Sequence, residues 1–402
     1  MKITAIICEY NPMTNGHIRH LNKAKSDTGC DTILCIMSGS FVQRGDPAIA
    51  DKYFRAQVAV KQGADVVVEL PTIYAISPAD NFAFGAIKTI SAFSDVEYLS
   101  FGSECGDAEL LTKAAMLLSD EPGELSALIQ KNSKNGDNYP KARALALNEY
   151  GKKHKDFENL IGILDKPNNV LGIAYITAVL KAGLNIKIHT IKRDGADYNS
   201  VECDSDYPSS TAIRNAIKRK DLESIANDVP YEVYSYISKL QTGEDALSDM
   251  ILFKIKSMSK EELSTCYDVS TNGILNRIKA ASISATTLDQ LLETAKTKNH
   301  TMARIKRLCL YALFGITNKM YQDAVTCPAH VSILAINESR KDTILSSLSL
   351  SCKNVLTRFS DVNRVDKTLR FLIQLDFTAQ GTLNIINRTS SYNKKMLLVS
   401  RS

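Results

Sequence analysis

The chain has 402 residues, of which 44% are hydrophobic and 23% are charged, and its formal net charge is +5. This length favours two or three domains, and the mixture of apolar and charged residues argues against long disordered stretches. No apolar run approaches the roughly 18 to 20 residues that a membrane-spanning helix needs, so we expect a cytoplasmic protein with no membrane contact.

The first 220 residues alternate between β-prone runs and helical patterns. The β-prone runs extend over Ile3 to Cys8, Thr32 to Met37, Val66 to Leu70 and Tyr98 to Phe101. A helix is expected from Asp51 to Gln62, with Gly63 ending it. Asp51 is expected to cap this helix, and we expect Lys52 to be exposed in its first turn. The alternation predicts an α/β domain built on a doubly wound parallel sheet.

The same alternation continues to the end of this first region. A helical pattern from Asn169 to Ala182 ends at Gly183 and leads into an alternating strand from Ile186 to Ile191. After the polar stretch Asp194 to Tyr207, Ser209 and its neighbours are typical of a helix start. That helix ends in the basic group Lys218-Arg219-Lys220, so we place the end of the doubly wound domain at residue 220.

The remaining sequence predicts two further regions. From residue 221 to about 330 the apolar spacing is helical. From 331 to 402 we expect a small mixed α/β piece, with a strand at Val331 to Ile336, a helix around Asp342 to Leu348 and a β-prone run at Leu369 to Phe377.

Positive charge is concentrated at the end of the chain. Residues 301–402 hold 15 Lys or Arg against 6 Asp or Glu, whereas residues 1–220 hold 26 of each. Such a region suits an anionic partner, although a basic surface can also serve solubility alone. Its basic residues include Arg304, Lys306, Arg307, Lys353, Arg358, Arg364, Lys367, Arg370, Lys394 and Lys395.

The cysteines and histidines do not predict a metal site. The nine cysteines are scattered, and no C-x-x-C pair occurs among them. Reduced thiols in a cytosolic protein are the simplest interpretation. Of the six histidines, only His17 and His20 lie close together in the sequence.

The segment after the first strand has the composition of a phosphate-binding turn. It runs from Cys8 through Thr14-Asn15-Gly16-His17 into a helical stripe. Strand carboxyl ends open onto a crevice in parallel sheets, and helix N-termini direct unpaired N–H groups at anions. His17 could donate to a phosphate oxygen and Thr14 could add a hydroxyl, but a lone histidine at a helix start can equally be a cap or a packing residue.

This segment resembles the T-x-G-H signature of the nucleotidyltransferase superfamily. That superfamily carries a second signature at a later helix start, and Ser210-Thr211-Ala212-Ile213-Arg214 resembles it in sequence and position. Two matches in the expected structural places are more specific than either motif alone.

Longer blocks resemble the bacterial tRNA(Met) cytidine acetate ligase family. They comprise Met37 to Ala48, Asp51-Lys52, Arg55-Ala56, Gly63 to Pro71, Phe101 to Asp107 and Pro167 to Tyr175. The resemblance covers most of residues 1–220, and beyond that it is one of length and layout. Ser40 is a departure, because most family members are expected to have asparagine there.

The resemblance implies a ligase reaction in two steps. ATP, expected with Mg²⁺, and acetate would form acetyl-adenylate and pyrophosphate. N4 of the wobble cytidine of elongator tRNA(Met) would then take the acetyl group, giving N4-acetylcytidine. A cofactor-type adenylyltransferase and a noncatalytic RNA-binding protein with a relic nucleotide site remain as alternatives.

The implied site residues gather at the ends of the predicted strands. His17 and Thr14 are the expected catalytic residues, and no metal ligands are assigned. The expected ATP contacts are Ile7, Cys8, Glu9, Tyr10, Asn11, Pro12, Met13, Thr14, Asn15, Gly16, His17, His20, Gly102, Asn168 and Arg193. From local sequence alone, Gly102 could be a turn glycine, Asn168 a helix cap and Arg193 a surface residue.

Four further side chains have weaker assignments. Gln43 and Arg44 follow the second strand and could hold acetate or the acetyl group, or simply form a loop. Arg214 and Lys218 share a helix face and suit phosphate or tRNA backbone, or a solvated face.

Overall fold

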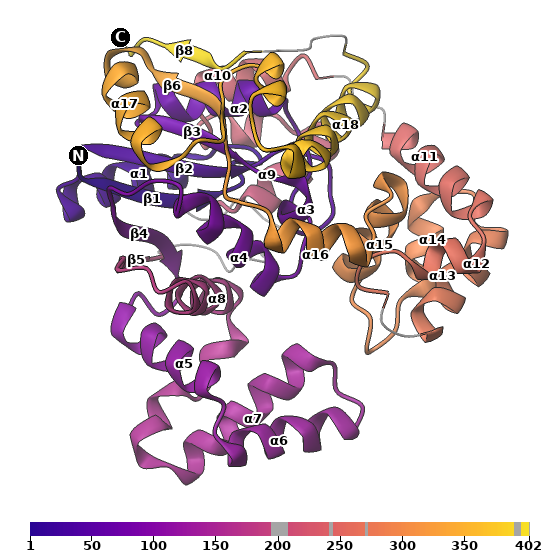
Figure 1. Cartoon of the computed structure of the whole chain (residues 1–402). Coiled ribbons are helices and arrows are strands. Elements are labelled where there is room, and N and C mark those ends of the chain that lie inside the picture. Colours follow the sequence, from indigo (N-terminus) through magenta and orange to yellow (C-terminus); the bar gives the residue numbers. More distant parts are fainter. Residues whose placement is uncertain (194–207, 241–243, 270–271, 390–394, 402) are drawn as a thin grey trace.

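The computed structural model describes residues 1–193, 208–240, 244–269, 272–389 and 395–401. The polar stretch 194–207, with Cys203 inside it, and Lys394 therefore lie outside the described residues. Figure 1 shows a central sheet with helices on both faces and two helical groups that project from this body.

The described strands form one sheet in the order β5-β4-β1-β2-β3-β6-β7, and β8 also pairs with β6. Neighbours among β1 to β5 are parallel, whereas β6 runs antiparallel to β3. The strands are β1 Ile3–Cys8, β2 Thr32–Ser38, β3 Val66–Leu70, β4 Val96–Ser103, β5 Lys187–Lys192, β6 Val331–Asn337, β7 Val355–Leu356 and β8 Leu397–Val399. The five predicted strands of the first region and the parallel sheet are confirmed.

Both faces of the sheet are buried, as the apolar strand sequences require. On β1, Ile3, Ala5 and Ile7 pack into one hydrophobic cluster, and Ile6 packs into the other. Helices α1 Asn15–Thr28, α2 Lys52–Lys61, α9 Ser210–Lys218 and α10 Tyr231–Ile237 contribute to the cluster that contains Ile6. Helices α3 Thr72–Ala75, α4 Ala79–Ile90 and α8 Pro167–Lys181 contribute to the opposite one. The doubly wound arrangement is therefore present.

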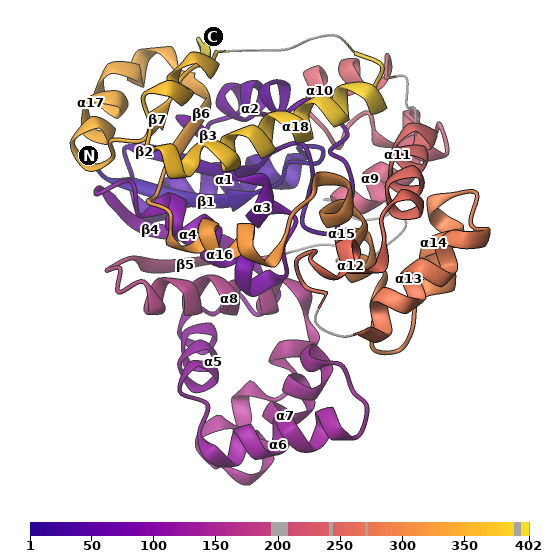
Figure 2. The same ribbon diagram turned by 45° about the vertical axis from the view of Figure 1, so that its right-hand side comes forward.

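Two helical groups extend from this body (Figures 1 and 2). One lies between β4 and α8 in the sequence and consists of α5 Ala108–Asp120, α6 Gly123–Lys134 and α7 Tyr139–Lys153. The other consists of α11 Glu244–Ser257, α12 Lys260–Ser264, α13 Asn272–Ser284, α14 Leu288–Ala295, α15 Met302–Phe314 and α16 Asn318–Thr326. The second group agrees with the helical spacing predicted after residue 221.

The C-terminal region extends the N-terminal sheet. Strand β6 pairs with β3, and the predicted helix appears as α17 Lys341–Ser351. The β-prone assignment of Leu369 to Phe377 is wrong, because this run lies at the start of helix α18, Arg370–Ile386. The buried positions of α18, among them Leu372, Ala379 and Leu383, continue at helical spacing well past Phe377.

The prediction for Lys52 is also wrong. Lys52 is 1% exposed, and its Nζ lies 2.6 Å from a carboxylate oxygen of Glu69 on β3. Asp51 does cap α2, since its side chain accepts hydrogen bonds from the backbone N–H groups of Tyr53 and Phe54. Because α2 packs on the sheet with its first turn inward, Lys52 meets the buried end of β3 instead of solvent.

Candidate active site

The turn between β1 and α1 is held rigidly by residues from distant parts of the chain. The guanidinium of Arg55 on α2 donates to the carbonyl oxygens of Glu9 (2.7 Å) and Ser38 (3.0 Å). Arg214 on α9 donates to the carbonyl oxygen of Asn11 at 2.6 Å, and the Ser210 hydroxyl donates to that of Pro12. These contacts hold the backbone from Glu9 to Pro12, directly before the T-x-G-H residues.

The hydrogen bonds of His17 determine its tautomer. The backbone N–H of Thr14 donates to Nδ1 of His17 at 3.0 Å, and the Thr14 hydroxyl lies 3.1 Å from the same atom. Because a backbone N–H can only donate, Nδ1 must accept, and the ring proton resides on Nε2. Burial, followed by the charges of Arg193 and His20, lowers the pKa of His17 to about 3. His17 is therefore a neutral hydrogen-bond donor.

A cavity opens at the carboxyl ends of β1, β2 and β4. Its lining includes ten of the predicted ATP contacts: Ile7, Cys8, Glu9, Tyr10, Asn11, His17, His20, Gly102, Asn168 and Arg193. Strand β1 sits between β4 and β2, and the order of connections reverses beside it, which is where open α/β sheets bind ligands. Apolar side chains missed by the sequence reasoning complete the walls, among them Phe82, Leu171 and Tyr175.

On the β4 side, Arg193 lies beside two other predicted residues, Gly102 and Asn168. A Cβ added to Gly102 would lie 3.2 Å from Cγ of Arg193, so glycine makes room for that arginine. Arg193 Nη1 lies 3.5 Å from Oδ1 of Asn168. Asn168 is the second residue of α8 and does not cap it; its amide instead donates to Glu104 at 2.7 Å. These contacts position one cation and one amide at this end of the cavity.

On the β2 side, a loop carries Gln43 and Arg44 into the cavity lining. The backbone N–H of Gln43 donates to Oε1 of Glu9 at 2.8 Å. Helix α15 supports this loop from behind, because Lys306 binds Asp46 at 2.6 Å and Arg307 donates to the carbonyl oxygen of Gln43. Lys306 and Arg307 thus have intramolecular roles, as does Arg304, which pairs with Asp268 at 3.1 Å.

The other predicted residues lie outside the cavity lining. Met13 is buried in the hydrophobic cluster under α1, and the Thr14 side chain is turned toward His17. Asn15 donates its side-chain amide to Asn227. Pro12 lies in the turn, where its carbonyl oxygen accepts from the Ser210 hydroxyl, and Gly16 lies in the first turn of α1. We therefore expect direct ligand contact from His17 and support of His17 from Thr14.

Comparison with known proteins agrees with this geometry. Residues 1–396 match the HIGH Nucleotidyl Transferase family. The chain is 35% identical to a tRNA(Met) cytidine acetate ligase of Clostridium acetobutylicum over 99% of this chain and 100% of that protein. A second such ligase, from Clostridium botulinum, is 34% identical over 98% of this chain and 97% of its own length. The chain belongs to the tRNA(Met) cytidine acetate ligase family.

Solved structures support the same family fold. The apo crystal structure of Thermotoga maritima TmcAL superposes with a TM-score of 0.91 at 30% identity, covering all of both chains. The structure of that protein with alpha-thio ATP bound superposes with a TM-score of 0.88, covering 99% of this chain and 100% of the other. The fold and the family predicted from the motifs are confirmed.

A second predicted histidine, His20, lies in a hydrogen-bond network. The sequence did not reveal this network. His20 Nε2 lies 2.9 Å from the Ser100 hydroxyl, which lies 3.0 Å from Nδ1 of His189. His189 Nε2 in turn lies 3.3 Å from Oδ2 of Asp27. The chain of contacts joins α1, β4 and β5, and only the parallel pairing of β4 with β5 brings Ser100 and His189 together.

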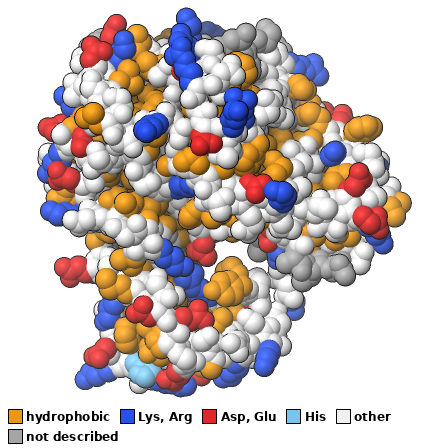
Figure 3. All heavy atoms as spheres, viewed as in Figure 1, with side chains coloured by type: hydrophobic (Ala, Val, Ile, Leu, Met, Phe, Trp, Pro, Cys, Tyr) orange, Lys and Arg blue, Asp and Glu red, His pale blue; other side chains and the backbone are white. Residues whose placement is uncertain are grey.

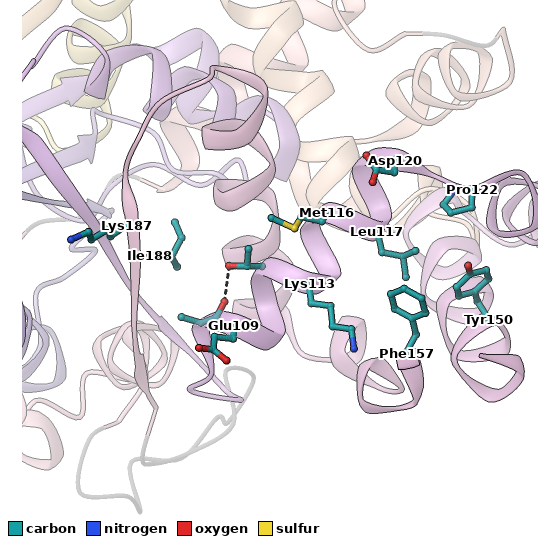
Figure 4. Close-up of a pocket in the computed structure, with 12 residues that line it drawn as sticks. Glu109, Lys113, Met116, Leu117, Asp120, Pro122, Tyr150, Phe157, Lys187 and Ile188 are labelled. Carbon is teal, nitrogen blue, oxygen red and sulfur yellow. Dashed lines mark hydrogen bonds between the residues drawn. The ribbon is translucent and has the colours of Figure 1, made fainter. Parts of the chain in front are cut away.

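A second hollow is present in this ligase-family chain, between α5 and the edge strand β5 (Figure 4). Its lining is mainly apolar, with Met116, Leu117 and Phe157 beside Lys113 and Lys187. None of the motif residues reaches it. The cavity at the end of β1 is therefore the candidate active site.

Proposed function

We propose that this protein ligates acetate to N4 of the wobble cytidine of elongator tRNA(Met) at the expense of ATP, through acetyl-adenylate. The observation that carries the proposal is the cavity itself. A neutral His17 donor, Arg193, Asn168 and Gly102 meet there, in a family whose relative from Thermotoga maritima has been crystallised with alpha-thio ATP.

In the first step, a carboxylate oxygen of acetate attacks the α-phosphorus and pyrophosphate leaves. Both reactants are anions, so the site must hold them together and stabilise the departing charge. We assign Nε2–H of His17 and the guanidinium of Arg193 to the phosphate oxygens. Gly102 and Asn168 are assigned to the nucleotide beside them, and the loop with Gln43 and Arg44 to the acetate at the opposite end.

Magnesium is expected to accompany ATP. Within the described ranges, no group of three His, Cys, Asp or Glu side chains is arranged to hold a metal ion. We therefore propose that triphosphate oxygens and water hold the ion, and neither step depends on a protein–metal bond.

In the second step, N4 of the cytidine attacks the acetyl carbonyl carbon and AMP leaves. The base must be unstacked to reach a cavity at the carboxyl ends of the strands, as is usual for enzymes that act on a nucleobase. We propose that residues 1–220 carry the chemistry and that residues 331–402 contribute tRNA contacts, with residues 221–330 between them. The cytoplasm, which holds both ATP and tRNA, is the proposed location. No helix within the described residues is long and apolar enough to cross a membrane.

The test measures the two half-reactions separately. Exchange of labelled pyrophosphate into ATP should require acetate and should proceed without tRNA. Labelled acetate should then appear in N4-acetylcytidine when tRNA(Met) is added, as shown by mass analysis of the nucleosides. His17→Ala should lower the exchange rate by about 10²- to 10³-fold, the usual loss for one preorganised donor. Pyrophosphate exchange at the same rate with and without acetate would contradict the proposal.

A further inference from the structure

Only two carboxylates line the described part of the cavity, and they differ in one respect. Asp46 is paired with Lys306 at 2.6 Å, so its charge is already engaged. Glu9 accepts one hydrogen bond, from the Gln43 backbone N–H to Oε1. Among the residues that the structure describes, no group donates to Oε2 of Glu9. One oxygen of Glu9 is thus fixed and the other is available to a ligand.

Glu9 is tied to the end of the cavity that lies opposite the residues assigned to the nucleotide. Strand β1 lies between β4, which carries Gly102, and β2, whose following loop carries Gln43. The residues assigned to the nucleotide, Gly102, Asn168 and Arg193, all lie on the β4 side. Glu9 is tied to the β2 side through Gln43, and its own carbonyl oxygen is held by the guanidinium on α2 at 2.7 Å. Its carboxylate is therefore held beside the loop that follows β2.

The second step requires a proton acceptor. The lone pair of the cytidine N4 is conjugated with the ring, so attack on a carbonyl has to be accompanied by loss of an N4 proton. His17 cannot take it, because Nδ1 is occupied by the Thr14 N–H and Nε2 already carries hydrogen. His20 is engaged through Nε2 with Ser100.

We propose that Glu9 is the general base of acetyl transfer, an assignment that rests on the proposed function. The N4–carbon bond forms as the bond between the acetyl carbon and the AMP oxygen breaks. The AMP oxygen leaves with the electron pair, and Oε2 of Glu9 takes the N4 proton. The proton passes to solvent when the product dissociates, which returns Glu9 to the carboxylate form.

The surroundings of Glu9 suit this role. Burial raises its pKa, and the Gln43 N–H and the charges of Arg214, Arg55 and Arg44 oppose that rise. A carboxylate with a raised pKa is a stronger base than one in water, and the three arginine charges favour its ionised form. Besides these cations, the titratable groups that line the same cavity are Cys8, Tyr10, His17, His20, Asp46, Tyr175 and Arg193.

The experiment separates Glu9 from the adenylation step. Glu9→Gln keeps an oxygen to accept from the Gln43 N–H but removes the base. Single-turnover transfer of labelled acetyl from preformed acetyl-adenylate to tRNA should fall by about 10²- to 10⁴-fold, and acetate-dependent pyrophosphate exchange should fall by far less. Glu9→Asp should recover part of the transfer rate, and Glu149→Gln on α7 is the matched control.

The pH profile provides a second readout. In the wild type the transfer rate should rise with pH as the base ionises and then level off, and in Glu9→Gln this rise should disappear. Equal loss of exchange and transfer in Glu9→Gln, or retention of both, would overturn the role of Glu9 and leave the proposed function intact. Exchange of pyrophosphate into ATP by the wild type without acetate would contradict both the proposed function and the role of Glu9.

Discussion

At the scale of single residues, the hydrogen bonds around His17 decide what its side chain can do. The Thr14 N–H fixes the ring orientation and leaves the proton on Nε2. A neutral imidazole can donate its Nε2–H to a phosphate oxygen while negative charge develops there, and its own protonation state does not change. Thr14, predicted as catalytic, is better described as the residue that positions His17.

The state of His17 can be tested directly by histidine-selective ¹⁵N NMR. Because its pKa is lowered to about 3, His17 of the free protein should remain in the neutral Nε2–H form from about pH 5 to 8. A pKa depressed in the folded state adds stability above the unfolded value near 6.5, and this stability is lost as the pH falls toward about 3. An imidazolium signal for His17 at about pH 6, assigned through its loss in His17→Gln, would contradict this.

At the scale of elements, buried polar and ionisable groups join α2, β3 and α18. Lys52 Nζ binds both carboxylate oxygens of Glu69 at 2.6 Å. On α18, Asp376 accepts from the Thr72 N–H at 2.6 Å, and Gln380 binds the Ser40 hydroxyl at 2.9 Å. Figure 2 shows α18 lying across the sheet near α3. Helix α18 therefore supports the loop that follows β2.

Removing Lys52 should be costly. Lys52→Met leaves Glu69 buried without a counter-charge, so the free energy of unfolding should fall by about 3–5 kcal/mol in urea denaturation. The double variant Lys52→Met/Glu69→Leu should recover much of the loss because neither charge remains. Lys61→Met, at the exposed end of the same helix, should change stability by less than about 1 kcal/mol. Equal losses in Lys52→Met and Lys61→Met would argue against a buried pair.

The same cluster predicts a pH dependence of stability. Burial and the neighbouring charge of Glu69 raise the pKa of Asp376 to about 8. A raised pKa in the folded state contributes stability that is full below about pH 4 and is lost as the pH rises toward about 8. Urea denaturation across this range should show a decline in the wild type that Asp376→Asn largely removes. A decline of the same size in both proteins would assign it to other groups.

At the scale of the whole molecule, two groups stand out among the described basic residues of 301–402. Arg304, Lys306 and Arg307 make intramolecular contacts that hold the helical group and the β2 loop. On the face seen in Figure 3, basic and acidic side chains are interspersed. The second group is exposed and is where we expect phosphate contacts; it consists of Lys353, Arg358, Arg364, Lys367, Arg370 and Lys395.

The exposed group can be tested by the salt dependence of tRNA binding. Replacing Arg364, Lys367 and Arg370 by Gln should weaken binding and reduce the slope of log K against log salt by up to about 3, roughly one for each phosphate that is no longer neutralised. Pyrophosphate exchange should be unchanged because it needs no tRNA. Replacing Lys131, Lys134 and Lys152 on α6 and α7 by Gln is the control. An unchanged slope in the C-terminal variant would exclude these side chains as phosphate contacts.

The sequence by itself determined the local features of this protein. The continuous apolar runs predicted β1 to β4, and an alternating run predicted β5. The motif at Thr14 to His17 lies on the predicted strand-to-helix turn, because periodicity and turn chemistry depend on near neighbours. Tertiary structure alone decided which distant groups meet. Three contacts join residues that are separated in the chain. Strand β6 pairs with β3, Lys52 is buried against Glu69, and Arg214 donates to the carbonyl oxygen of Asn11. No periodicity encodes such contacts, because they arise only when the helices pack onto the sheet and exclude water from the groups between them.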